Sequence, residues 1–133
     1  REVVRDELAP LADAGAHVGQ IMDASQPSYV LAYWMRERGV LGLADAVRRL
    51  TSVPAKVFGI ADRGVIAPGA YADINVIDIG AVELDHPEFV HDLPGGAGRF
   101  VQRASGYRWT LVNGAPVLAD GARTGALPGH MLR

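Results

Sequence analysis

Apolar positions in the first half of the chain recur at helical spacing. Residues 28–38 carry aromatic and small apolar residues at this spacing, with Pro27 near the start and Gly39 just after the end. Proline is tolerated in the first helical turn because its missing N–H would have no partner there, and glycine commonly ends a helix. We therefore expect a helix over about residues 28–38.

A second apolar repeat follows at once. Leu43, Ala46, Val47 and Leu50 stand at positions i, i+3, i+4 and i+7, which is the spacing of one face of a helix. This pattern predicts a helix over residues 43–51. A further short helical turn is expected at residues 54–58, ending at Gly59.

The pattern changes after Gly59 from helical spacing to strict alternation. Residues 72–78 alternate between apolar and polar positions, which predicts a half-buried strand. Asn113-Gly114 stands between two apolar runs, and this dipeptide favours a type I′ hairpin because both central residues need positive φ. Pro116 indicates an edge strand or a bulge. We expect residues 80–98 to form a long acidic connection and residues 124–133 an irregular tail.

These elements divide the chain into two parts. Residues 1–59 are predicted to be loop and helix, with an Ala- and Gly-rich loop at residues 10–25, and residues 60–133 are predicted to be strands and turns. Neither part has the apolar positions of a self-sufficient core. The chain also opens without a methionine, which favours a piece of a longer protein.

Composition excludes several classes of protein. Of the 133 residues, 49% are hydrophobic and 21% are charged, so the chain should fold rather than stay disordered. The net charge is −2 and no Lys/Arg-rich run is present, which argues against nucleic-acid binding. No long apolar stretch or signal peptide is visible, so no membrane partner is expected. The absence of Cys excludes disulfides and Cys-based zinc sites and fits a cytoplasmic protein.

The candidate chemistry lies near the start of the chain. Asp13 is followed by small residues and, four positions later, by His17. A carboxylate in such a setting can bind a metal ion and take a proton from metal-bound water. The alternative is an ordinary cap or turn aspartate, which the residues alone favour. His17 has three interpretations: a metal ligand, a substrate contact or a loop residue bonded to the backbone.

The rest of the chain carries few residues that indicate a catalytic or metal-binding role. Asp85-His86 and His91-Asp92 could form a small metal clip, but the surrounding Pro and Gly residues favour an exposed loop. No serine stands in a nucleophile motif, and residues 95–98 are Gly-rich without the Lys that a phosphate loop needs. The aromatic residues of the first predicted helix are more typical of a core or an interface.

Several segments of the chain form a recognisable set. They are Asp13-Ala14-Gly15-Ala16-His17-Val18, residues 33–39, residues 46–55, Ala61-Asp62-Arg63-Gly64, Pro68-Gly69, Ala72-Asp73-Ile74-Asn75-Val76, Asp92-Leu93-Pro94, Leu111-Val112-Asn113-Gly114 and Thr124-Gly125-Ala126-Leu127-Pro128-Gly129. Taken together, these segments resemble the carboxy-terminal part of the N-acyl-D-amino-acid deacylases of the amidohydrolase superfamily. The resemblance spans about residues 11–133.

This resemblance implies a fold. Family members are (β/α)₈ barrels with a small β-sandwich, and their active site lies at the carboxyl ends of the barrel strands. The chain would then be an α+β fragment. Residues 1–59 would hold the last loop and helices of the barrel, with the metal-site aspartate, and residues 60–133 would hold the carboxy-terminal part of the β-sandwich.

The resemblance also implies an activity. Zinc would activate a water that attacks the N-acyl amide of an N-acyl-D-amino acid. Asp13 matches the aspartate that serves as base at the metal, and His17 would be a neighbouring substrate contact. Three features depart from the family pattern: Pro10-Leu11-Ala12 replaces Gly-Leu-Ser, His130 stands where arginine is usual, and no His-x-His motif is present. We therefore expect the isolated chain to be inactive and to bind no zinc tightly.

Two alternatives remain beside the enzyme fragment. The chain could be a stand-alone β-rich interaction module, or a pseudoenzyme subunit that lends Asp13 to a barrel on another chain. If the helices within residues 28–51 normally cover a barrel, they should expose an apolar stripe here. Exposed apolar stripes drive association, so we expect the isolated chain to form a dimer or to repack.

Overall fold

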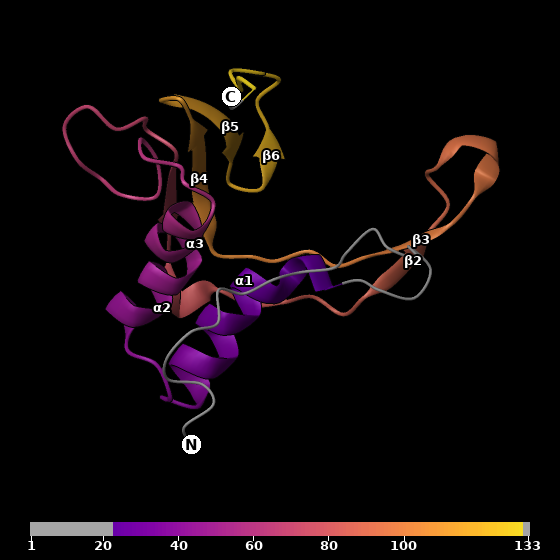
Figure 1. The fold of residues 1–133 in the computed structure, drawn as a ribbon. Coiled ribbons are helices and arrows are strands. Elements are labelled where there is room, and N and C mark those ends of the chain that lie inside the picture. The colour runs from indigo at the N-terminus through magenta and orange to yellow at the C-terminus, as the bar shows by residue number, and fades with distance from the viewer. Residues whose placement is uncertain (1–22, 132–133) are drawn as a thin grey trace.

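The computed structural model describes residues 23–131, beginning with a group of helices (Figure 1). A short 3₁₀ turn, η1 (Asp23–Ser25), leads into α1 (Gln26–Tyr29), which continues as the π-type helix η2 (Val30–Glu37). At its end the Arg38 amide donates to the Tyr33 carbonyl at 2.8 Å, five residues back. The helix expected over residues 28–38 is confirmed, and its π geometry was not predicted.

Two more helices follow. α2 (Leu43–Leu50) and α3 (Ser52–Val57) confirm the remaining helical predictions. In the described part of the chain, no helix has the length and apolarity needed to cross a membrane.

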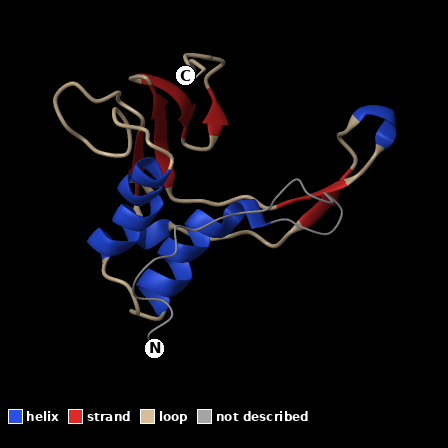
Figure 2. Cartoon of the chain, in the orientation of Figure 1, coloured by secondary structure: helices blue, strands red, loops and turns tan. Residues whose placement is uncertain are grey.

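The strands form two antiparallel sheets (Figure 2). In the larger sheet, β1 (Ile74–Ile77) pairs with β4 (Tyr107–Val112), β4 with β5 (Ala115–Ala119), and β5 with β6 (Ala122–Arg123). The predicted strand at residues 72–78 is therefore confirmed as β1. The 3₁₀ turn η3 (Ile79–Ala81) follows β1 directly.

The predicted hairpin is also confirmed. Asn113 and Gly114 have φ of 50° and 80°, the positive values that a type I′ turn requires. The β4–β5 register shifts between Thr110 and Leu111, so the strand pair contains an irregularity beside Pro116, the partner of Leu111. β6 pairs only with Leu118 and Ala119, which leaves the Pro116 end of β5 outside that ladder.

The expectation of a long acidic connection over residues 80–98 is wrong in part, because the segment contains a strand. β2 (Glu88–Val90) pairs with β3 (Arg99–Val101) to form a narrow arm, with η4 (Pro94–Gly96) near its tip. Figure 1 shows the arm extending away from the helices and the larger sheet. Phe89 and Phe100 face each other across it, with ring centroids 5.0 Å apart. Strands of three residues are too short to give a visible alternation in sequence.

The buried apolar core is small and joins the two parts of the chain. Among the described residues it comprises Leu31, Ala32, Ala46 and Val82, of which the last two are completely buried. Leu43 and Val47, on the predicted apolar face of α2, are instead 49% and 44% exposed. The helices therefore do carry uncovered apolar side chains, as expected. The chain leaves much of its apolar surface in contact with water.

Candidate functional site

Both residues that sequence analysis singled out, Asp13 and His17, lie outside the described residues. The structure therefore does not test the role of either side chain. What it does describe is the helix that follows them in the chain, and how the helix is attached to the rest of the fold.

The remaining histidines do not form a metal site. Residues 23–131 contain no group of three or more His, Cys, Asp or Glu side chains that could hold a metal ion. His91 Nδ1 lies 3.0 Å from the Gly96 carbonyl oxygen, within the arm. Asp92 accepts two hydrogen bonds from Arg99, at 2.8 and 2.7 Å, and these lower its pKa below the ordinary value. The alternative of a metal clip at residues 85–92 is thus not supported.

The helix of residues 26–37 is attached to the β-rich part by hydroxyl groups at its start. Ser28 is buried, and its hydroxyl lies 2.7 Å from the Tyr107 hydroxyl at the beginning of β4. Next to it, Ser25 Oγ donates to Gln102 Oε1 at 2.5 Å, and Gln102 Nε2 donates to the Asp85 carbonyl at 2.9 Å. These contacts link one helix start to the base of the arm and to the larger sheet.

Arg36 makes the corresponding attachment near the other end of the helix. Its Nη1 lies 2.7 Å from the Val82 carbonyl, 3.1 Å from that of Gly80 and 3.3 Å from that of Ile79. These carbonyls belong to η3 and the residue that follows it. A single cationic group thereby satisfies the backbone acceptors of the turn that leaves β1.

A second polar cluster holds the loop before β1 against the β4–β5 hairpin. Arg63 forms an ion pair with Asp73 and donates to Asn113 Oδ1 at 2.9 Å. The Asn113 amide donates to Asp73 Oδ1 at 2.8 Å, and Asn113 Nδ2 donates to the Pro128 carbonyl at 2.6 Å. The Arg63 guanidinium also lies 4.4 Å from the ring centroid of Tyr71. We refer to Arg63, Asp73 and Asn113 as the arginine cluster.

The electrostatics of this cluster favour an ionised Asp73. Partial burial raises the pKa of Asp73, but the hydrogen bonds from the Asn113 amide and from Arg63, together with the charge of Arg63, outweigh it. The net result is a pKa below the ordinary value. The three residues of the arginine cluster bond to one another and to the backbone, with Arg63 Nε buried without a partner among the described residues. Their arrangement is that of a structural junction.

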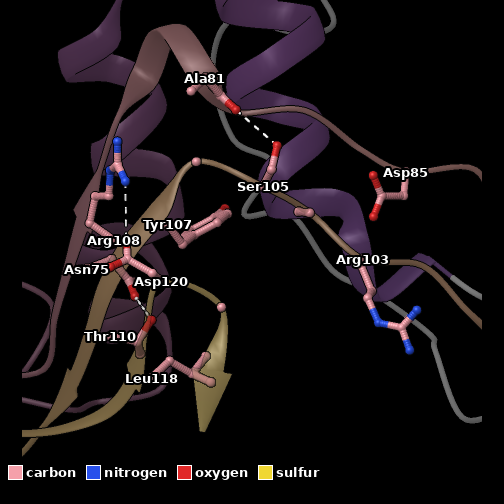
Figure 3. A pocket seen from close by; sticks show the side chains of 13 residues that line it. Asn75, Ala81, Asp85, Arg103, Ser105, Tyr107, Arg108, Thr110, Leu118 and Asp120 are labelled. Atoms are coloured by element: carbon pink, nitrogen blue, oxygen red, sulfur yellow. Dashed lines mark hydrogen bonds and ion pairs between the residues drawn. The ribbon is translucent and has the colours of Figure 1, made fainter.

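A hollow of about 830 Å³ lies on one side of the larger sheet, near the base of the arm (Figure 3). Several of its polar groups bond one another: Asn75 Oδ1 accepts from Thr110 at 2.8 Å, and Arg108 lies 3.2 Å from Asp120. The residues that line it are Asn75, Ala81, Asp85, Arg103, Ala104, Ser105, Gly106, Tyr107, Arg108, Thr110, Leu118, Asp120 and Gly121. Its lining therefore shows no nucleophile paired with a base.

The class of protein is given by the match of the chain to a family model. The model of the amidohydrolase family matches residues 7–118, which is most of the chain and includes Asp13 and His17. The chain belongs to the amidohydrolase family.

Among curated proteins, the chain is similar to deacylases of Alcaligenes xylosoxydans xylosoxydans. It is 39% identical to an N-acyl-D-glutamate deacylase over 104 residues and 36% identical to a D-aminoacylase over 103 residues. These matches cover 78% and 77% of this chain but 19% of each relative. The chain thus spans about a fifth of the length of the relatives it matches.

Solved structures of deacylases are also similar to this chain. The crystal structure of a D-aminoacylase superposes with a TM-score of 0.60 at 34% identity, covering 75% of this chain and 19% of that one. An N-acyl-D-glutamate deacylase from Bordetella bronchiseptica, complexed with zinc and a phosphonate inhibitor, gives a TM-score of 0.54 at 37% identity. This match covers 72% of this chain and 19% of the Bordetella bronchiseptica protein. The predicted resemblance to the N-acyl-D-amino-acid deacylases is confirmed.

The polar attachments were missed by sequence reasoning. The residues of the arginine cluster stand in the segments Ala61–Gly64, Ala72–Val76 and Leu111–Gly114, which carried the family resemblance, but nothing local in those segments indicates that they meet. Ser28 and Tyr107 gave no signal, because a hydroxyl on a helix or a strand is ordinary until its partner is known.

Proposed function

We propose that these 133 residues form the carboxy-terminal part of a zinc-dependent amidohydrolase that hydrolyses the N-acyl amide bond of N-acyl-D-amino acids. We call that longer protein the parent enzyme. The observation that carries the proposal is the identity of 36–39% to two deacylases over more than three quarters of this chain. The substrate class is taken from what those relatives are named for.

Asp13 is the residue of this chain that we assign to the reaction. It falls within the family match, and its motif resembles the aspartate that the deacylases place at the metal. In this role its carboxylate serves as a metal ligand and as the base that accepts a proton from the attacking water. We assign His17, four positions on, a contact with the substrate. His17 is the weaker assignment because a backbone-bonded loop histidine explains it equally well.

Zinc does not fit the described residues on their own. They offer no set of three ligands, and one carboxylate from Asp13 cannot complete an open catalytic site. In this proposal the other ligands come from the parent enzyme outside these 133 residues, and the isolated chain binds zinc weakly or not at all. When bound, the metal would supply an activated water and polarise the amide carbonyl.

We further propose how the two parts of the chain fit the parent enzyme. Residues 1–59 would be the last loop and helices of its (β/α)₈ barrel, and residues 60–133 part of a β-sandwich. The larger sheet supports the second assignment: Val76 and Trp109 are cross-strand partners and are 46% and 44% exposed. An exposed apolar pair that joins the edge strand β1 to its neighbour β4 is a contact surface that a second layer would cover.

The test is hydrolysis by the parent enzyme. N-Acetyl-D-glutamate, N-acetyl-D-aspartate and N-acetyl-D-methionine are offered in turn, with the L-enantiomers as stereochemical controls, and release of the free amine is followed. We expect turnover of at least one D-substrate and none of its L-enantiomer. Absence of turnover on every D-substrate, with zinc bound, would contradict the proposal.

The isolated chain provides a second readout. We expect no turnover of the same substrates above background, with or without added zinc, because a site of one carboxylate lacks the rest of the catalytic groups. Zinc-dependent hydrolysis by the 133 residues alone would overturn this part of the proposal. An active parent that does not need this segment would instead favour the stand-alone interaction module or the pseudoenzyme subunit.

A further inference from the structure

The turn of the β4–β5 hairpin, Asn113-Gly114, is a dipeptide that can modify itself by deamidation. The glycine nitrogen attacks Cγ of the asparagine, a new C–N bond closes a succinimide ring, and the Cγ–Nδ2 bond breaks to release ammonia. Water then opens the ring to give aspartate or isoaspartate. Glycine favours the attack because it has no side chain to hinder its nitrogen. Asn75, the other asparagine of the chain, is followed by the β-branched Val76, which hinders it.

The geometry of the turn opposes this reaction. In a type I′ turn the first central residue has ψ of about +30°, which places its Cβ and the next backbone nitrogen on opposite sides of the Cα–C bond. A succinimide ring contains both atoms and needs them on the same side. The φ values of 50° for Asn113 and 80° for Gly114 are those of a type I′ turn. The ring can therefore close only after the turn has opened.

The two nitrogens that take part in the reaction are both held by backbone carbonyls. The N–H of Gly114, whose nitrogen is the nucleophile, donates to the Ala72 carbonyl at 2.9 Å. The leaving nitrogen, Nδ2 of Asn113, donates to the Pro128 carbonyl at 2.6 Å. Ring closure must break both hydrogen bonds, so the turn would have to separate from the segment before β1 and from the tail.

The arginine cluster adds a charged clamp to the same turn. Arg63 donates to Asn113 Oδ1 at 2.9 Å, and Asp73 accepts from the Asn113 backbone N–H at 2.8 Å. Donation to Oδ1 also polarises the Cγ carbonyl, which by itself would favour attack. The geometric effect decides, because polarisation cannot act while Cβ and the nucleophile lie on opposite sides of the Cα–C bond. The Arg63 side chain is only 13% exposed, so water competes little for it.

We propose that Asn113-Gly114 is a latent deamidation site that the arginine cluster holds closed. Its rate of deamidation is then the rate of the open turn multiplied by the fraction of molecules in which the turn is open. Loss of a hydrogen bond to a charged group raises such an open fraction by about tenfold or more. This site is independent of the catalytic function proposed for Asp13.

Either product would prevent the turn from closing again as before. Aspartate at position 113 has no Nδ2 to donate to the Pro128 carbonyl. Isoaspartate adds a methylene group to the backbone of a two-residue turn, whose length sets the register of the hairpin. Deamidation would therefore detach the hairpin irreversibly from the tail and from the segment before β1.

The test follows Asn113 by mass spectrometry of the parent enzyme after incubation at neutral pH and digestion with trypsin. The tryptic peptide of residues 109–123 contains one asparagine and no glutamine, so a mass increase of deamidation in it reports Asn113 alone. We expect Asn113 to deamidate at least about tenfold more slowly in the folded enzyme than in the enzyme unfolded in urea. Equal rates in the two states would overturn the proposal. Asn75 should remain unmodified in both.

Two variants test the arginine cluster itself. Asp73→Ala removes the acceptor for the Asn113 amide together with the partner of Arg63, and Arg63→Lys is a milder change that loses the guanidinium fork but keeps the charge. We expect Asn113 in folded Asp73→Ala to deamidate at least about tenfold faster than in the wild type, with a smaller acceleration in Arg63→Lys. Wild-type rates in the folded variants would overturn the proposal, and Arg63→Lys decides alone if Asp73→Ala does not fold.

Two controls separate opening of the cluster from general effects. Arg103→Ala removes an exposed ion pair with Glu88 in the arm, so the rate at Asn113 should stay within about twofold of the wild type. Gly106→Ala destabilises the opposite end of β4, where a Cβ would lie 2.7 Å from the Val82 nitrogen, and should leave the cluster closed. If Gly106→Ala accelerates deamidation as much as Asp73→Ala does, global unfolding controls the rate and the proposal is overturned.

Discussion

Arg63 is the residue at which the segment before β1 meets the β4–β5 hairpin. Its guanidinium pairs with Asp73 before β1, binds the Asn113 side chain in the hairpin turn, and lies against the ring of Tyr71. The Asn113-Gly114 turn was predictable because its conformation is a local property of two residues. Its attachment to Arg63 was not, because it depends on a contact across 50 positions.

The arginine cluster should contribute measurably to stability. We expect Asp73→Ala to lower the free energy of unfolding by about 1–2 kcal/mol, since it removes an ion pair and the acceptor for the Asn113 amide. The measurement is urea unfolding of the dilute chain. Arg108→Ala is the control: its pair with Asp120 is exposed on both sides, so a change within about 0.5 kcal/mol is expected. Equal effects of the two substitutions would contradict this account.

The effect of Asp73 should depend on pH. Its pKa in the folded protein lies below 3.8, the value for the unfolded chain, so the folded state favours the ionised form. The stabilisation is therefore complete well above pH 3.8 and is lost as pH falls through the folded-state pKa. The difference in unfolding free energy between wild type and Asp73→Ala should be constant from about pH 6 to 8 and shrink below about pH 4. A difference that grows in acid would show that the cluster does not stabilise the carboxylate.

At the scale of elements, the sequence predicted the helices and strands that have a clear hydrophobic periodicity or a turn signal. It missed the elements that have neither. Three helices, β1 and the β4–β5 hairpin were visible because each has its own spacing or turn signal. The β2–β3 arm was not, since its strands have three residues each and their pairing is seen only when Phe89 meets Phe100. The spacing of the apolar residues in η2 does not distinguish a π-type helix from an α-helix, so this geometry was also missed.

One close approach between elements is set by a glycine. Gly106 has φ of 87°, and a Cβ at this position would lie 2.7 Å from the Val82 backbone nitrogen and 2.8 Å from the Ala81 carbonyl carbon. We expect Gly106→Ala to cost about 3 kcal/mol, combining the strain of positive φ with a clash against backbone that cannot move aside.

Gly125→Ala separates the two contributions to that cost. Gly125 has φ of 85°, but no atom lies within 4 Å of the position that an alanine Cβ would take, so the substitution should cost only about 1 kcal/mol. The measurement is again urea unfolding. Similar costs at the two positions would show that the chain at Gly106, just before β4, does not approach the Val82 backbone as closely as the structure indicates.

At the scale of the whole molecule, large apolar side chains are exposed on several of the described elements, among them Leu43 and Val47 of α2. We propose that the isolated chain associates through the exposed side of α2, where Leu43 and Val47 lie, and forms a dimer. Leu43→Lys combined with Val47→Lys should abolish association in light scattering. Ala44→Lys, at another exposed position of the same helix, should leave it unchanged. A wild-type chain that stays monomeric at high concentration would contradict the proposal.

The central claim is that this chain brings one catalytic carboxylate, Asp13, to a metal-dependent hydrolase. The most direct measurement is kcat of the parent enzyme carrying Asp13→Ala, on the D-substrate that the wild type prefers, with the melting temperature recorded alongside. We predict a loss of about 1,000-fold in kcat with an unchanged melting temperature, because the base for the attacking water is removed. Activity within about tenfold of the wild type would contradict the account.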